Sequence, residues 1–198
     1  QSTKAYKRYY WWFYLGTSAF MKAGPVEFGR FYKFVSWNDI EGVRLRFGGR
    51  TSVDFSKKIM LDAYAAYGTK DKEVKYDVGI TTHLKRTNDR WHMLKVRYKD
   101  DYTRLGVNNP LMTYDNIINS ITRTDGLDDL FRQQQFSLSY EREWLKGLMT
   151  TGQFNHTIWK SVPGRFEYSK TDDQGNVVPV SSITSTELSL STRIAFKE

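Results

Sequence analysis

The chain has 198 residues, a formal net charge of +8 and no cysteine. Its length suits a single domain, and the missing thiol excludes cysteine nucleophiles, zinc–thiolate centres and a disulfide framework. Basic and acidic residues are interleaved without a block of one sign, which argues against a nucleic-acid partner.

Hydrophobic residues make up 39% of the chain and aromatic residues 16%, so rings are abundant and aliphatic core residues are few. No segment approaches the roughly 18–20 apolar residues of a transmembrane helix. The first ten residues lack the apolar region of a signal peptide. We therefore expect either a cytosolic chain or the processed or excised part of a longer exported one.

Nearly every interpretable segment alternates polar and apolar residues with the period of two that is typical of a β-strand. Many segments reach about ten residues, the length with which a tilted strand crosses a bilayer. The predicted strands are 9–21, 26–35, 42–52, 58–68, 73–84, 90–100, 133–145, 147–160 and 182–197. The pattern predicts an all-β fold, an antiparallel up-and-down meander that forms all or part of a transmembrane outer-membrane β-barrel. A soluble all-β domain is the alternative.

The first predicted strand contains the aromatic run RYYWWFYLG, residues 8–16. Its rings fall on both faces of the strand, which favours an aromatic girdle at a membrane rim over a surface that stacks nucleic-acid bases. Further tryptophans lie near predicted strand ends, at Trp37, Trp91, Trp144 and Trp159.

The third predicted strand lies in the stretch EGVRLRFGGRTS, residues 41–52, whose arginines share one face. Gly48 and Gly49 match no phosphate-binding loop and predict a bend or bulge. The polar faces of later strands carry both signs of charge, and opposite charges can pair across strands. Such charges would either form an ion-pair ladder that stabilises the barrel or line a selective pore. The candidate lumen-lining residues are Arg44, Arg46, Arg50, Asp62, Lys75, Asp77, Lys95, Arg97, Glu141, Glu143, Glu187 and Arg193.

The predicted connections differ in length. Two are long, near residues 101–132 and 161–181, and in a meander both project from one rim, an asymmetry typical of outer-membrane barrels. We interpret residues 115–121 as loop or helix, because an extra strand there would place the long loops on opposite rims. The turn-forming composition of residues 161–181 predicts an irregular loop or an exposed hairpin.

Catalytic chemistry is not indicated. His83, His92 and His156 lie on different predicted strands without metal-ligand spacing. Glu141 and Glu143 share a strand face, and the stretch SYEREW predicts an ion-pair ladder rather than an acid–base pair. We expect no catalytic residue, no metal, no cofactor and no enzyme activity.

Four stretches together resemble a known family: DIEGVRLRFGGRTS at 39–52, LDAYAAYGTKDKEVKYDVG at 61–79, YEREW at 140–144 and LSTRIAFKE at 190–198. They are similar to a Bacteroidota outer-membrane β-barrel family of unknown function that follows a carboxypeptidase-regulatory-like domain and is distantly akin to TonB-dependent receptors. The resemblance implies export, a barrel longer than this chain and no enzyme activity. Nine strands is an odd count, so we expect residues 1–198 to be one segment of a larger barrel.

We therefore expect a non-enzymatic protein of the cell outer membrane that acts in transport or in a cell-surface or outer-membrane assembly. Its expected partners are outer-membrane lipid and, through the long loops, other outer-membrane or surface proteins. The alternative is a soluble all-β module that binds an anionic ligand through Arg44, Arg46 and Arg50. An esterase-like barrel enzyme is a third possibility, but the sequence shows no nucleophile and base for it.

Overall fold

The computed structural model describes residues 20–29, 33–84, 90–104, 130–162, 168–172 and 174–195. Within these ranges the chain forms strands and turns and has no α-helix. None of the described residues belongs to a helix with the length and apolar character needed to span a bilayer. The strands are β1 (Phe20–Ala23), β2 (Val26–Gly29), β3 (Val35–Asn38), β4 (Gly42–Thr51), β5 (Ile59–Gly68), β6 (Val74–His83), β7 (His92–Arg104), β8 (Leu130–Leu145), β9 (Leu148–Lys160), β10 (Tyr168–Thr171), β11 (Val177–Val180) and β12 (Ser182–Ile194).

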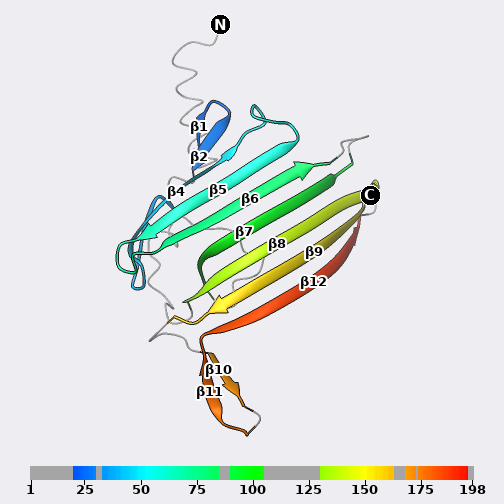
Figure 1. Cartoon of the computed structure of the whole chain (residues 1–198). Coiled ribbons are helices and arrows are strands. Elements are labelled where there is room, and N and C mark those ends of the chain that lie inside the picture. Colours follow the sequence, from blue (N-terminus) through cyan, green and yellow to red (C-terminus); the bar gives the residue numbers. More distant parts are fainter. Residues whose placement is uncertain are drawn as a thin grey trace.

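Ten strands form one twisted antiparallel sheet in the order β1-β2-β4-β5-β6-β7-β8-β9-β12, with β3 also paired to β4 (Figure 1). Each strand from β4 to β9 pairs with the next along the chain. The predicted all-β antiparallel meander is confirmed. β10 and β11 form a separate hairpin that projects beyond the sheet (Figure 1).

Alternate connections leave the sheet at the same rim because neighbouring strands run in opposite directions. The β7–β8 and β9–β12 connections therefore share one rim, here called the long-loop rim, as predicted. The β4–β5, β6–β7 and β8–β9 connections lie at the opposite rim, the short-turn rim. Residues 115–121 lie outside the described residues, but β8 pairs directly with β7.

Some predicted boundaries differ from the structure, and one lies mostly outside the described residues. The segment 26–35 is not one strand, because β2 and β3 each cover a different part of the edge of β4. β7 continues to Arg104, so Asp101 belongs to a strand and not to the long loop. Only the last two residues of the predicted strand 9–21 fall within the described residues, and its aromatic run lies outside them.

The hairpin interpretation of residues 161–181 is correct for its described part. The Asp172 carboxylate accepts backbone N–H bonds from Gln174 and Asn176, at 3.0 and 2.8 Å, and so organises the β10–β11 turn. These bonds favour the ionised form and lower the pKa of the Asp172 carboxyl, with the Asn176 bond as the largest cause.

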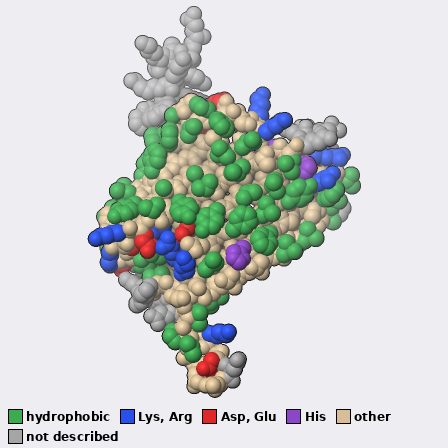
Figure 2. All heavy atoms as spheres, in the orientation of Figure 1, with side chains coloured by type: hydrophobic (Ala, Val, Ile, Leu, Met, Phe, Trp, Pro, Cys, Tyr) green, Lys and Arg blue, Asp and Glu red, His purple; other side chains and the backbone are tan. Residues whose placement is uncertain are grey.

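The two faces of the sheet have opposite chemistry, and the hydrophobic face is the exposed one. Exposed large hydrophobic side chains recur along the strands, such as Leu45, Val78 and Leu138. Figure 2 shows hydrophobic side chains spread over this apolar face, with charged side chains gathered toward its ends. Among the described residues, four hydrophobic side chains are buried against ten polar or charged ones. The buried interior is therefore largely polar.

Gly48 permits a close approach of β4 to β5. Of the predicted bend or bulge, the bulge is absent from the β4–β5 ladder. The β4–β5 ladder runs from Arg44 to Arg50 without a register shift. A Cβ at Gly48 would lie 2.4 Å from the Cβ of Tyr64, whereas opposite residues in an antiparallel pair keep their Cβ atoms about 4.5–5.5 Å apart. The two strands are therefore drawn together on the charged face at this point.

Gly48→Ala should destabilise the sheet by about 1–3 kcal/mol, because the new methyl group must displace the backbone of β5. Gly152→Ala is the matched control, since a Cβ at Gly152 meets nothing within 4 Å. The control should be neutral or stabilising by up to about 1 kcal/mol. Urea unfolding followed by tryptophan fluorescence measures both, and equal midpoints for the two variants would contradict the close-approach explanation.

Candidate functional site

The pairing register places all twelve predicted lumen-lining residues on one face of the sheet, the charged face. For example, Arg46 lies opposite Ala66, which lies opposite Lys75 on β6. The same alternation carries this face through β7, β8 and β9 to Glu187 and Arg193 on β12. Their role as the lining of a lumen stays a prediction.

Most of these residues form ion pairs, five of them with one another and three with carboxylates outside the predicted set. Arg97 bonds both Asp77, at 2.8 Å, and Asp62. The Asp62 contact crosses β6 at Gly79, which lies between the two residues in the ladder. A side chain there would occupy the path, because a Cβ at Gly79 would lie 2.6 Å from Asp62 Oδ1. Two further pairs are Lys95 with Glu141 and Arg50 with Glu27.

The most buried group, here called the Arg44 cluster, consists of Glu41, Arg44, Lys75 and Asp101. Arg44 donates two bonds to the Asp101 carboxylate, at 2.8 and 2.7 Å, and also donates to Glu41. Lys75 lies 3.0 Å from Glu41 and is 0% exposed. Removing charges from water is costly unless they are paired, and here each charge has an opposite partner.

The Arg44–Asp101 contact requires the sheet to curve. Arg44 lies on β4 and Asp101 on β7, with β5 and β6 between them. Three strand spacings amount to about 14 Å, yet the side chains of the two residues meet directly. The charged face is therefore concave and the apolar face convex, which explains why the charged side chains are buried and the hydrophobic ones are exposed.

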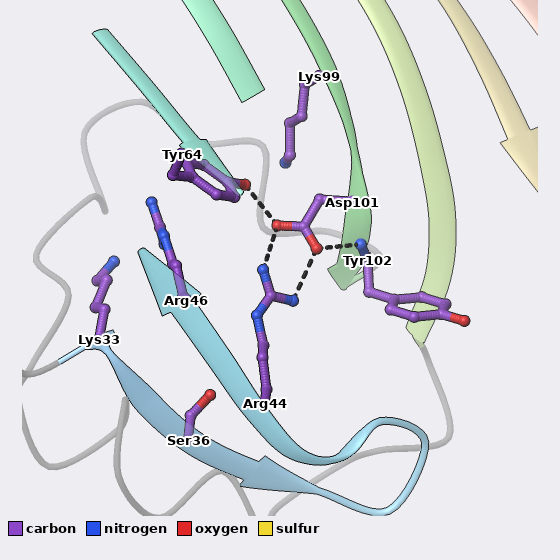
Figure 3. Close-up of a pocket in the computed structure, with 8 residues that line it drawn as sticks. All are labelled: Lys33, Ser36, Arg44, Arg46, Tyr64, Lys99, Asp101 and Tyr102. Carbon is purple, nitrogen blue, oxygen red and sulfur yellow. Dashed lines mark hydrogen bonds and ion pairs between the residues drawn. The ribbon is translucent and has the colours of Figure 1, made fainter. Parts of the chain in front are cut away.

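A pocket of about 170 Å³ opens on the charged face near the long-loop rim (Figure 3). β3, β4, β5 and β7, together with the residues just before β3, supply its side chains. The lining residues are Lys33, Ser36, Arg44, Arg46, Tyr64, Lys99, Asp101 and Tyr102.

Both carboxylate oxygens of Asp101 accept hydrogen bonds within this pocket. Besides both nitrogens of Arg44, its oxygens accept the Tyr64 hydroxyl at 2.5 Å and the backbone N–H of Tyr102 at 2.7 Å (Figure 3). Its negative charge is thus neutralised by Arg44. Among the described residues it is the only carboxylate in the lining.

Arg46 and Lys99 differ from the neighbouring cations on their own strands, Arg50 and Lys95. The Arg46 guanidinium lies over the Tyr64 ring, 3.5 Å from its centroid, and the Lys99 ammonium donates to Thr103 Oγ1 at 2.9 Å. Neither has a carboxylate within ion-pair distance among the described residues. Asp77, opposite Lys99 in the ladder, is bonded to Arg97 instead.

The remaining predicted residues lie away from this pocket. Glu143 accepts backbone N–H bonds from Gly147 and Trp91, and so holds the short-turn rim. Glu187 and Arg193 lie on the edge strand β12, where both are exposed. The structure thus places Arg44 and Arg46 at the pocket. Glu143, Glu187 and Arg193 lie elsewhere on the charged face.

Sequence reasoning missed several residues of the Arg44 cluster and the pocket. Glu41 lies in the turn before β4, where no alternation marks it. Asp101 continues the alternation of Lys95, Arg97 and Lys99, so extending that pattern beyond residue 100 would have found it.

The described histidines have separate partners. His92 contacts the Tyr140 hydroxyl at 2.8 Å, His156 contacts the Thr186 hydroxyl at 2.9 Å, and the ring of His83 lies 6.1 Å from that of Trp91. Within the described ranges, no three His, Asp or Glu side chains gather as a metal site would require.

Comparison with known proteins finds one family. Residues 17–189 match the C-terminal domain of a family of unknown function, DUF5686. No curated protein and no solved structure matches the sequence.

Arg44→Met should destabilise the protein by about 3–5 kcal/mol, because it leaves the buried Asp101 and Glu41 carboxylates with unbalanced charge. The double variant Arg44→Met/Asp101→Leu should recover part of this loss, since it removes both partners of the main contact. Arg193→Met, on the exposed edge strand, should change stability by no more than about 0.5 kcal/mol. Urea unfolding gives these three values and that of the single variant Asp101→Leu, and a double variant as unstable as the sum of its two single variants would contradict the pairing explanation.

Proposed function

The chain belongs to the C-terminal domain of DUF5686, a family of unknown function, and we propose that this domain is an integral β-barrel of the cell outer membrane, or part of one. It acts without catalysis, in transport or as a component of a cell-surface or outer-membrane assembly. The exposed hydrophobic face of the sheet carries this proposal.

Water is a poor solvent for such a face. The convex face presents hydrophobic side chains from β4 to β12, among them Phe47 at 61% and Leu188 at 85% exposure. Contiguous apolar surface of this kind marks a site that meets a membrane or another protein. The charged concave face has the composition expected of a water-filled barrel interior. Lipid against one face and water against the other would satisfy both.

The height of the apolar band supports a bilayer as the partner. On β8, the convex face is apolar or aromatic between Gln134 and Arg142, and Arg132 follows beyond Gln134. Gln134 and Arg142 are eight residues apart, about 26 Å along a strand at about 3.3 Å per residue. With the usual tilt of about 35–45°, this corresponds to a height of about 20 Å, close to the roughly 25 Å of the apolar band of outer-membrane barrels.

Both ends of the band have the side chains expected at a membrane–water boundary. At the long-loop rim, Arg132 bonds Asp100 at 2.7 Å and also Glu73. At the short-turn rim, Arg142 stacks on Trp144, whose exposed fraction is 46%. Trp159 does not belong to such a girdle, because it lies on the charged face against Phe131.

The family resemblance of the sequence supports a more specific proposal about the protein. It suggests a Bacteroidota protein in which this barrel region follows a carboxypeptidase-regulatory-like domain, with a distant relation to TonB-dependent receptors. In this arrangement outer-membrane lipid covers the convex face. The two connections at the long-loop rim would then meet other outer-membrane or surface proteins.

A soluble all-β module for an anionic ligand is the second candidate, favoured by the excess of cations in the pocket. It leaves the convex apolar face without a cover. The two candidates therefore differ in what this face contacts.

Adjacent positions on β8 provide the test, since the chain has no cysteine of its own. Leu138→Cys places a label on the convex face and Ser137→Cys places it on the concave face. With an environment-sensitive fluorophore on each, the full chain is reconstituted into phosphatidylcholine vesicles. We expect nitroxides on the lipid tails to quench the label at 138 several-fold more than at 137, and aqueous iodide to show the opposite order.

The same preparation gives the contradicting result. If the protein stays in the aqueous phase without detergent, and iodide quenches both positions equally, the membrane proposal is wrong and the soluble module is favoured.

A further inference from the structure

We propose that the pocket between β3, β4, β5 and β7 binds a doubly charged tetrahedral oxyanion, a phosphate ion or the phosphate group of a monoester, through Arg46 and Lys99. This site does not depend on the membrane proposal, because either a barrel interior or a soluble module would expose the concave face to water. It assigns a ligand to a pocket of the charged face where two cations have no bonded carboxylate among the described residues.

The charge balance of the pocket favours an anion. Among the described residues, its lining has four cationic side chains and one carboxylate, Asp101, and one of the cations, Lys33, has an interaction of its own. Arg44 neutralises Asp101, and Arg44 also contacts Glu41 behind it. The nearby Asp77 is bonded to Arg97. The positive charges of Arg46 and Lys99 are thus left without a bonded counter-charge among the described residues.

The neighbouring cations on the same strands are paired. Arg50 lies on the same strand and face as Arg46 but bonds Glu27 at 2.8 Å. Lys95 lies on the same strand and face as Lys99 but bonds Glu141. The described part of the chain therefore supplies carboxylate partners for neighbouring cations of the same type but none for Arg46 and Lys99.

The geometry of Arg46 suits bidentate binding. Its guanidinium carbon lies over the Tyr64 ring, 3.5 Å from the centroid, in a cation–π contact that holds the group in place. An arginine side chain held in this way can donate in parallel to two oxygens of a phosphate. Tyr64 is itself held by its bond to Asp101, so the platform is rigid before a ligand arrives.

Lys99 supplies the second charge. Its ammonium has three N–H donors, of which one goes to Thr103. Figure 3 shows Arg46 and Lys99 directed toward Tyr64 from β4 and β7. Two donors of Lys99 remain for a ligand between the strands, and the Ser36 hydroxyl also lines this space.

The volume and charge narrow the class of ligand. A pocket of about 170 Å³ is smaller than the roughly 300–1,000 Å³ of sites for drug-sized molecules, so it holds a small group. A phosphate dianion balances both available cations, whereas a carboxylate balances one. Basic side chains also repel metal cations.

Isothermal titration of the purified full chain, at low ionic strength and in micelles if detergent is needed, tests the site. The probes are inorganic phosphate, glucose 6-phosphate and acetate. Arg46→Gln/Lys99→Gln should weaken phosphate binding about tenfold or more, since it removes charge-assisted hydrogen bonds. Arg50→Gln/Lys95→Gln is the matched control. It removes two equal charges from the same strands and face, and should stay within about twofold of the wild type.

Each outcome has a definite meaning. Phosphate binding that is lost only in the first variant supports the site. Tighter binding of glucose 6-phosphate then identifies a monoester as the source of the phosphate, and equal affinity identifies the free ion. The proposal is overturned if the wild type binds no phosphate, if both variants weaken binding equally, or if acetate binds as tightly as phosphate. Circular dichroism checks that both variants are folded.

Discussion

The contact between Arg44 and Asp101 is the constraint on which the arrangement of this sheet depends. It joins β4 to β7 across two intervening strands and is bidentate and buried. A flat sheet would hold these side chains apart, so the contact and the concave charged face belong together. The curvature then decides the exposure of every other side chain, because it crowds one face and opens the other.

This arrangement reverses the usual amphipathic sheet of a soluble domain. There, hydrophobic side chains form the core and charges face water; here the buried groups are mainly charged or polar, and the convex face is hydrophobic. A charged interior is stable only when its members are paired. Lys75, which is fully buried, illustrates this because it lies between Glu41 and Asp71. The ion pairs therefore take the structural place that hydrophobic packing has elsewhere.

Some cations of the charged face have a bonded carboxylate and others do not. The bonded cations stabilise the sheet, whereas Arg46 and Lys99 form the candidate binding site. Arg97, Lys95 and Arg50 each have a bonded carboxylate. Arg46 and Lys99 have an aromatic ring and a hydroxyl instead. Since the described residues supply counter-charges to the neighbouring cations but not to these two, the proposed phosphate would supply the missing negative charge.

The alternation of residues was sufficient to predict the strands, the meander and the face on which each charged residue lies, because a strand directs successive side chains to opposite sides. It could not predict which charges pair. Arg50 and Asp62 face each other in the ladder, yet Arg50 bonds Glu27 and Asp62 bonds Arg97. The alternation also did not predict the role of Glu41, which lies in a turn, or the division of residues 26–35 into two strands. These features depend on the curvature and pairing register of the sheet, which bring together side chains that are distant in the sequence.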